Sequence, residues 1–340
     1  MPRRPTTRRA VLAAALGTSG LLAAPLATPG RASDAAARWP SRPVRLIVAS
    51  AAGGNADLVA RLLAAELEAA HGGRVVVENM PAVSGVRAVE AAARAEPDGH
   101  TLLVGTSSQL VMNLALFDPL PVDLEREVRG VAMLNRVPMA LAVPASEPAR
   151  DLAAFRARLA ASGAEAAYGS GPTGTTTHIA GALFVARSGV RALHVPYTSS
   201  ALAATDLVAG RLAFMFDALV TALPHAREGR TRLLALASAR RSPAAPDLPT
   251  MAEAGLPGFE AATWNSVAAP AALPDALARE INAAVGAALA RPALAERLAA
   301  LGAEPLGDPP PEEVDAFYRA ERALWLPVLR DAGVRPAVVN

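Results

Sequence analysis

The chain has 340 residues, of which 33 are basic, 31 are acidic and 52% are hydrophobic, enough apolar side chains for the cores of two lobes. Every basic residue is arginine and there is no cysteine, which excludes Schiff-base lysines, disulfides, thiol nucleophiles and thiolate metal sites. Residues 1–32 contain five of the arginines and no acidic residue, so the remainder has a net charge of −3 and gives no reason to expect a nucleic-acid partner.

The N-terminus has the pattern of an export signal. Four arginines among the first nine residues precede an apolar run over 10–26, and small residues lead up to Ala32. This run is shorter than the roughly 20 residues that span a bilayer. We therefore expect a signal at 1–32, cleavage after Ala32 and a mature protein in the periplasm. Residues 7–12 resemble the twin-arginine motif, but Val11 replaces the usual Phe, so general secretion stays an alternative.

Short runs of Val, Leu and Ile then alternate with helical segments, which is typical of βαβ units. Strands are expected at 44–48, 75–78 and 101–105, and helices at 57–70 and 86–94. In the first of these helices Val59, Leu63 and Leu67 recur every four residues, so one face should pack on a parallel sheet.

A glycine pair, Gly53-Gly54, lies between the first strand and its helix. Glycines allow consecutive N–H groups to point into one concavity at the positive end of a helix, which suits a carboxylate or phosphate. No Lys-Ser/Thr follows, which excludes the phosphate-binding loop of NTPases. An ordinary turn is the alternative. We predict ligand contacts from Ala51, Ala52, Gly53, Gly54 and Asp57.

Ser107 and Ser108 follow the third strand, where they would donate hydrogen bonds to a ligand from a loop. The second glycine of a G-x-S-x-G nucleophile elbow is missing, which argues against a serine hydrolase. A loop that packs only on itself is the other alternative.

A second α/β unit follows, with strands expected at 140–143, 167–169, 193–195 and 214–216, and helices at 151–162, 175–188 and 199–209. Residues 169–174 match the G-x-G-x-x-G dinucleotide fingerprint, but no acidic residue occurs between Glu165 and Asp206 to hold a ribose. We expect a second anion-binding loop instead, with contacts from Thr173, Gly174 and Thr175 and a further hydroxyl donor from Thr176.

The five histidines show no metal-ligand spacing, so neither a metal nor a cofactor is expected. His178 is either a ligand contact or a helical histidine bonded to a nearby loop. Asp217 follows a buried strand at a position where ligands of α/β sheets bind, and the alternative is a helix cap. Tyr197 should shape the rest of the site.

The last part of the sequence contains one extended run, 264–269, and then only helices, at 275–290, 292–301 and 311–331. Phe317, Leu324 and Val328 lie near one face of the last helix, which should pack back on the first lobe. Two crossings, near 141–143 and 263–266, would then form a hinge.

The chain resembles the solute-binding proteins of tripartite tricarboxylate transporters, the Bug family, from Trp39 to Val334. The matching motifs are Trp39-Pro-Ser-Arg-Pro-Val-Arg-Leu, Gly53-Gly54-x-x-Asp57, Val77-Glu-Asn79, Pro97-Asp-Gly-His-Thr-Leu, Gly174-Thr-x-x-His178-x-Ala-Gly, His194-Val-Pro-Tyr197, Met215-Phe-Asp217 and Leu248-Pro-Thr-Met-Ala-Glu-Ala-Gly-Leu-Pro-Gly258.

The resemblance implies an α/β, two-lobed type II periplasmic-binding-protein fold, each lobe a sheet flanked by helices, joined by a two-crossing hinge. Lobe 1 would comprise 39–141 with 263–340, and lobe 2 would comprise 142–262. A monomeric, non-enzymatic receptor would capture a small mono- or dicarboxylate and deliver it to inner-membrane permease subunits. The family holds one ligand carboxylate with backbone amides and water from two loops, and its Asp, here Asp217, faces the distal part.

Two departures concern the cleft: Ser50 replaces a family aromatic, and Tyr197-Thr-Ser replaces Tyr-Lys-Gly. The identity of the carboxylate is therefore left open, as is the choice between transport and signalling to a sensor kinase. An exported serine hydrolase using Ser107 or Ser108 is the rival from another class.

Overall fold

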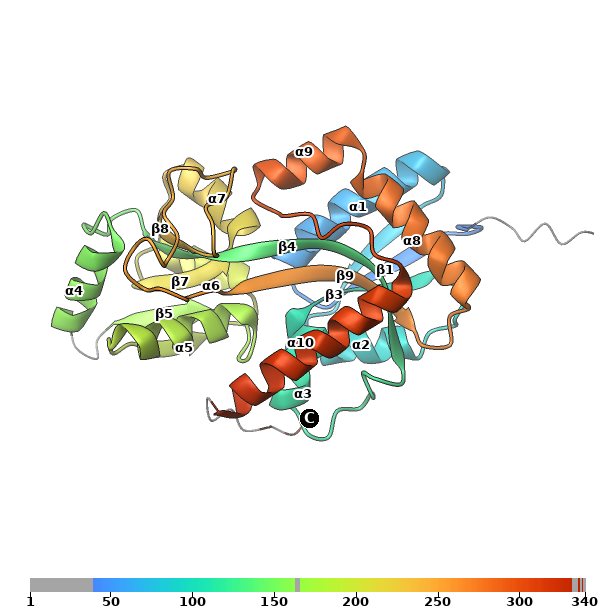
Figure 1. The fold of residues 1–340 in the computed structure, drawn as a ribbon, viewed down its shortest axis with the longest axis horizontal. Coiled ribbons are helices and arrows are strands. Elements are labelled where there is room, and N and C mark those ends of the chain that lie inside the picture. Colours follow the sequence, from blue (N-terminus) through green and yellow to red (C-terminus); the bar gives the residue numbers. More distant parts are fainter. Residues whose placement is uncertain (1–38, 163–165, 332–335, 337, 339–340) are drawn as a thin grey trace, which may run out of the picture. The chain divides into compact units, whose positions relative to one another are not determined.

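The computed structural model describes residues 39–162, 166–331, 336 and 338 (Figure 1). The predicted export signal lies outside these residues. Among the helices that are described, none combines the length and the apolar character needed to cross a membrane.

The first βαβ units form as predicted. Strands β1 (Val44–Val48), β2 (Val75–Asn79) and β3 (Thr101–Thr106) are parallel, in the order β2-β1-β3, and are connected by α1 (Asn55–His71) and α2 (Val86–Ala93). Alternate side chains of β1 join different cores: Leu46 packs in the cluster that contains α1, and Ile47 packs in the cluster that contains α2. The two helices therefore cover opposite faces of the sheet.

The longest strand, β4 (Val128–Pro144), passes through both lobes, as the long green arrow in Figure 1 shows. Its residues 128–138 pair with β9 (Ala262–Pro270). From Met139 onward it pairs with β7 (Phe214–Ala218) and β8 (Thr231–Ala237). The sequence predicted only 140–143 as a strand. Nearly all of β4 is buried, so its sequence lacks the polar alternation that identifies a half-buried strand.

The second lobe contains the parallel strands β5 (Ala167–Ser170), β6 (Leu193–Pro196) and β7. Its helices are α4 (Leu152–Ser162), α5 (Thr176–Ser188), α6 (Ser200–Val208) and α7 (Leu219–Arg227). Its core includes stacked and edge-on aromatic rings from Phe155, Phe184, Phe214, Phe216 and Phe259. The whole sheet has the order β2-β1-β3-β9-β4-β7-β5-β6, with β8 also on β4.

The chain then returns to the first lobe through α8 (Asp275–Leu289), α9 (Pro292–Ala300) and α10 (Pro311–Asp331). Helix α10 packs on β4, where a Cβ added at Gly130 would lie 2.4 Å from Val314. Of the face predicted to be buried, Phe317 packs against the core, but the prediction was wrong for Leu324, which is 58% exposed. Val314, Tyr318 and Arg322 are buried instead. Arg322 can be buried because its guanidinium donates to the carbonyls of Leu110 and Leu124.

Short helical turns complete the first lobe: η1 (Val83–Gly85), the π-helix η2 (Ser108–Met112) and α3 (Asn113–Leu116). The sequence predicted a loop where η2 begins. Two chain segments connect the lobes, one within β4 at Met139 and one at Ala261, whose carbonyl accepts a hydrogen bond from the Met139 N–H at 2.9 Å. The lobe boundaries at 141/142 and 262/263 stay predictions.

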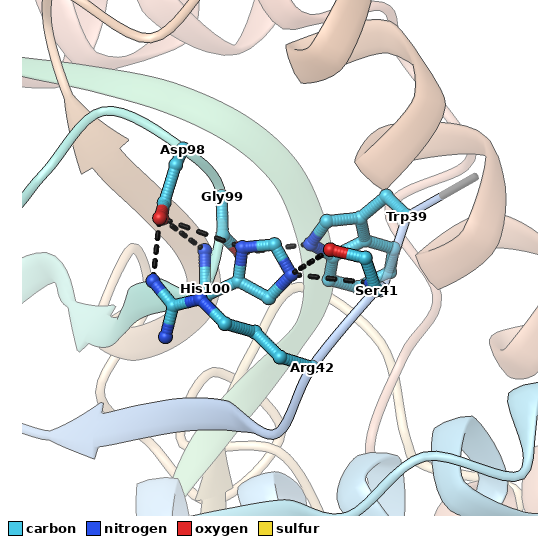
Figure 2. A network of polar contacts seen from close by, with 6 residues as sticks. All are labelled: Trp39, Ser41, Arg42, Asp98, Gly99 and His100. Atoms are coloured by element: carbon cyan, nitrogen blue, oxygen red, sulfur yellow. Dashed lines mark hydrogen bonds and ion pairs between the residues drawn. The ribbon is translucent and has the colours of Figure 1, made fainter. Parts of the chain in front are cut away.

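A polar network anchors the start of β1 to the loop before β3 (Figure 2). Trp39 donates from Nε1 to the Gly99 carbonyl at 2.8 Å, and the Ser41 N–H donates to His100 Nε2 at 3.2 Å. Arg42 pairs with Asp98, which also accepts from the His100 N–H at 3.0 Å. Two of the motifs that carry the family resemblance therefore contact each other and stabilise the first sheet.

A candidate ligand cavity

A cavity of about 100 Å³ lies between the lobes, which is far more space than one water molecule needs. The first lobe contributes residues from the β1–α1 loop, from η1 and from the β3–η2 connection. The second lobe contributes the starts of α5, α6 and α7, and Met139 and Thr263 come from the two connecting strands. The cavity is therefore built where the lobes meet at the hinge.

Four helices begin at this cavity. The residues that precede α1, α5, α6 and α7 are Gly54, Thr175, Ser199 and Ala218, and all four line it. Ser199 caps α6 with its own hydroxyl, which accepts from the Leu202 N–H. No side chain caps α1 or α5. Apart from the Thr176 N–H of α5, which donates to Ser108 Oγ at 3.3 Å, the first N–H groups and the positive dipole ends of these two helices are thus available to an anion.

Among the described residues that line the cavity, Asp217 is the only charged one, and no arginine or histidine lies on the wall. Asp217 is 4% exposed. Its Oδ1 accepts from the Ala218 N–H at 2.9 Å, and its Oδ2 accepts from the Thr221 hydroxyl at 2.8 Å. Burial raises the pKa of Asp217 to about 6, although these two hydrogen bonds favour the charged form. Asp217 therefore has the cavity position expected from the sequence, whereas it does not cap α7, whose first turn has no side-chain cap.

The first predicted loop reaches the cavity through Ala51 and Gly54, whereas Ala52, Gly53 and Asp57 do not line it. The carboxylate of Asp57 turns back on its own loop, where it accepts from the Gly53 N–H at 2.9 Å. Gly53 has φ +79°, the left-handed region that favours glycine, but Gly54 has φ −84°. The special backbone conformation therefore belongs to Gly53, while Gly54 matters because it has no side chain beside the cavity.

The hydrogen bonds that hold Asp57 explain its pKa. Its carboxylate also accepts from Asn79 Nδ2 at 2.9 Å and pairs with Arg61. Burial would raise the pKa of this carboxyl, but the bonds from Arg61, Gly53 and Asn79 together hold it below its ordinary value. Asp57 is thus an ionised residue that fixes the shape of the glycine turn.

Ser107 and Ser108 connect the lobes. Ser108 lines the cavity, and its Oγ accepts from the Thr176 N–H at 3.3 Å. Ser107 does not line it; its hydroxyl contacts those of Thr176 at 3.1 Å and Thr263 at 3.2 Å. Within the described residues, no histidine is a hydrogen-bond partner of either serine, so the pair lacks the base that a serine nucleophile requires.

The second predicted loop reaches the cavity through Thr175, but Thr173, Gly174 and His178 do not line it. Gly174 has φ +81° and lies against Leu116 of the first lobe. His178 Nδ1 accepts from the Gly174 N–H at 3.0 Å, which is the helical-histidine alternative considered from the sequence. Tyr197 also points elsewhere, because its hydroxyl donates to Asp206 at 2.7 Å.

Most wall residues carry no motif that a sequence pattern could single out, although several are the immediate neighbours of predicted helix starts. Thr176 lines the cavity, as expected of a hydroxyl donor in the second loop. The lining residues not predicted as contacts are Ala49, Ser50, Asn55, Ala56, Pro81, Ser84, Thr106, Gln109, Met139, Gly171, Pro172, Thr177, Thr198, Ser199, Ser200, Ala218 and Thr263. Their hydroxyls and amides give the wall neutral polarity.

Comparison with known proteins identifies the family. Residues 59–333 match the model of the tripartite tricarboxylate transporter family receptor, TctC. The chain belongs to this family. It is 33% identical over 312 residues to protein BugT of Bordetella pertussis, which covers 91% of this chain and 95% of that protein.

Solved structures of TctC-type receptors share the fold. R. palustris Rpa4515 with adipate is 34% identical, with a TM-score of 0.84, and the match covers 88% of this chain and all of that one. MatC from Rhodopseudomonas palustris with bound malate is 32% identical, with a TM-score of 0.78 and coverage of 86% and 100%. The structure of periplasmic binding protein BugD is 29% identical, with a TM-score of 0.83 and coverage of 88% and 100%.

These likenesses confirm the two-lobed periplasmic-binding-protein fold and the solute-receptor class expected from the sequence. TctC proteins are receptors and not enzymes, and their family is periplasmic. Within the part of the chain that the structure describes, no group of three or more His, Asp or Glu side chains is arranged to hold a metal ion.

Proposed function

We propose that this TctC-family protein captures a small carboxylate between its two lobes in the periplasm and delivers it to the membrane permease of a tripartite transporter. The observation that carries the proposal is the cavity itself, where α1 and α5 begin without a cap from their own N-cap residues and where the described residues of the wall include no cationic side chain. The adipate and malate bound to two relatives support the same ligand class.

Neutral N–H donors are sufficient for such a ligand. A hydrogen bond to a charged group contributes about 1.5–3 kcal/mol, and each helix N-terminus adds about 0.3–1 kcal/mol of favourable electrostatic energy. Three such bonds at about 2 kcal/mol each, together with two helix N-termini, contribute about 7–8 kcal/mol, which is close to the roughly 8 kcal/mol of micromolar affinity. A carboxylate held between α1 and α5 would contact both lobes and so stabilise the closed form.

The proposed contact residues are those predicted positions that line the cavity: Ala51, Gly54, Ser108, Thr175 and Asp217. The first four surround the open helix ends. Asp217 repels a second carboxylate when ionised and accepts from a hydroxyl or amine, so it would choose among ligands. The other predicted positions would act by holding the two loops in shape.

Thermal-shift screening followed by calorimetry tests the ligand class. The panel contains acetate, succinate, adipate and malate, each beside its neutral amide. A ligand at a hundred times its dissociation constant stabilises by about 2.7 kcal/mol, which raises the melting temperature by several degrees. We expect at least one acid to produce this shift while its amide does not. Equal shifts for acid and amide, or none for any acid, would reject the proposal.

Location and delivery need separate tests in cells. The mature protein should occur in the periplasm with an N-terminus near Ser33, and replacing Arg8 and Arg9 with Gln should retain it in the cytoplasm if the twin-arginine route is used. Export of the double variant would exclude that route without changing the location. Deleting the gene should abolish uptake of the radiolabelled acid that binds best; unchanged uptake would favour a sensing role over delivery.

A further inference from the structure

Two histidine side chains form hydrogen bonds with the second loop of the cavity. This loop connects β5 to α5, and its residues Gly171, Pro172 and Thr175 line the cavity. His178 contacts the end of the loop at Gly174, and His194 contacts its beginning at Ser170. Neither histidine lines the cavity, so neither is placed to contact a ligand held there.

The hydrogen bonds define which ring nitrogens carry a proton. His178 Nδ1 accepts from the Gly174 N–H at 3.0 Å, so this nitrogen is unprotonated. The single hydrogen of the Ser170 hydroxyl is donated to the Gly171 carbonyl at 2.6 Å. His194 Nε2, at 2.8 Å from the same hydroxyl, must therefore be the donor to it. In the neutral form, each ring therefore carries its proton on Nε2, which is consistent with the hydrogen bonds to the loop.

The two rings are also stacked on each other. Their centroids are 4.0 Å apart with an interplanar angle of 19°, and Tyr168 from β5 stacks on His194 at 4.9 Å. Two protonated rings at this distance would repel each other. In addition, a proton on His178 Nδ1 would face the Gly174 N–H, so that two donors would oppose each other. The geometry therefore requires a neutral His178 and excludes a pair in which both rings are protonated.

We propose that His178 and His194 are positioning residues, which as a stacked neutral pair hold the 170–174 loop in the conformation that binds a carboxylate. This inference rests on the proposed carboxylate site and adds a pH-sensitive support for it. Protonation of the pair loosens the loop and weakens binding, although neither ring touches the ligand.

The surroundings keep the pair neutral at ordinary pH. Desolvation lowers the pKa of His178, and desolvation together with the neighbouring His178 lowers the pKa of His194 to about 4. Among the residues that the structure describes, the titratable groups that face the pair are each other and Tyr168, whose pKa burial raises to about 12, so that it stays neutral. The native form thus binds fewer protons than the unfolded chain, and its support of the loop falls as pH falls from about 6.5 towards 4.

Two His178 variants separate the hydrogen bond from the titration. His178→Asn keeps an acceptor near the position of Nδ1 and cannot be protonated in this range, whereas His178→Leu removes the acceptor. Hydrogen exchange of the peptide that contains Gly174, measured on the ligand-free protein at pH 7, should be about tenfold faster in the Leu variant and nearly unchanged in the Asn variant. Affinity for adipate or malate, whichever binds the wild type, should weaken in the same order.

The pH profile supplies a readout that a merely structural role would not move. Exchange in the wild type, corrected for its intrinsic pH dependence, should accelerate between pH 6.5 and 4, and His178→Asn should remove most of that acceleration. Asp217 titrates equally in both proteins and so cancels in the comparison. Long-range ¹⁵N–¹H spectra of histidine-labelled wild type should show Nδ1 of His178 unprotonated at pH 7.

Unchanged exchange and affinity in the Leu variant, or a proton on His178 Nδ1 at pH 7, would overturn the inference. If the Leu variant does not fold, the tautomer and the comparison of wild type with His178→Asn still decide. If the wild type binds no acid of the panel, the carboxylate proposal fails, while hydrogen exchange still reports whether the pair supports the loop.

Discussion

Replacing Asp217 with asparagine should stabilise the ligand-free protein at neutral and alkaline pH. The carboxyl is buried beside the cavity, and its pKa is raised from 3.8 to about 6. The amide has nearly the same shape. Its oxygen can still accept from the Ala218 N–H, and its NH₂ can donate to the Thr221 hydroxyl, which in turn donates to the Ala218 carbonyl. The substitution therefore removes a buried charge without leaving an unpaired group.

The size of the expected stabilisation follows from the raised pKa of Asp217. A rise of about two pKa units at 1.36 kcal/mol per unit corresponds to about 3 kcal/mol. Between pH 3.8 and about 6 the native carboxyl keeps a proton that the unfolded chain has released, so the free energy of unfolding falls as pH rises through this window. This net shift already includes the two hydrogen bonds to the charged form, and the weaker hydrogen bonds of the asparagine amide offset about 1 kcal/mol. Asp217→Asn should thus be about 2 kcal/mol more stable than wild type above pH 7.

Urea unfolding at pH 8 and pH 4 measures this difference. The gain should be present at pH 8 and absent at pH 4, where the wild-type carboxyl is already neutral. Asp206→Asn is the matched control, because Arg211 and Tyr197 hold the pKa of Asp206 below its ordinary value and its neutralisation should give no gain. An Asp217→Asn variant that is no more stable than wild type at pH 8, or that is stabilised equally at both pH values, would show that the buried charge of Asp217 does not destabilise the native state.

Two pairs of substitutions test the geometry of the loops. Gly53→Ala should lower the free energy of unfolding by about 1 kcal/mol, because Gly53 has a φ of +79°. Gly54→Ala should leave stability unchanged and weaken ligand affinity, since its Cβ would project beside the cavity. Equal stability losses of the two variants in urea unfolding would contradict this difference. Gly174→Ala would place a Cβ 2.1 Å from Leu116 and disfavour closure, and Leu116→Ala should recover part of the loss. A double-mutant cycle should give a coupling of at least about 1 kcal/mol, and additive effects would show that the two residues do not meet.

The amphipathic and βαβ segments of the fold could be predicted from the sequence because their periodicity is local. The N-terminal half of β4 was not, because it is buried on both faces and contains Arg136 and Pro138, which break an apolar run. Helix α7 was missed because Pro224 lies inside it. The buried face of α10 was predicted incorrectly because an arginine such as Arg322 is normally expected to be exposed to solvent. Its burial becomes understandable only from its hydrogen bond to the Leu110 carbonyl.

In the candidate site, too, the sequence predicted the local features, and it did not predict those that depend on contacts between distant segments. Both glycine-containing loops do reach the cavity, as their position between a strand and a helix predicts. The roles of single residues depend on which way a side chain turns. Asp57 and His178 each bind a backbone N–H of their own loop four residues earlier, and no sequence pattern distinguishes such a contact from one to a ligand. Gly171 and Pro172 line the cavity only because the second lobe meets the first there.

The central claim is that backbone N–H groups at the starts of α1 and α5 hold a ligand carboxylate between the lobes. A crystal structure with the acid that gives the largest thermal shift tests it most directly. One carboxylate is expected to accept hydrogen bonds from N–H groups at both helix starts, at about 3 Å or through one bridging water, with no arginine in contact. A carboxylate bound by an arginine, or a ligand seated outside this cavity, would contradict it.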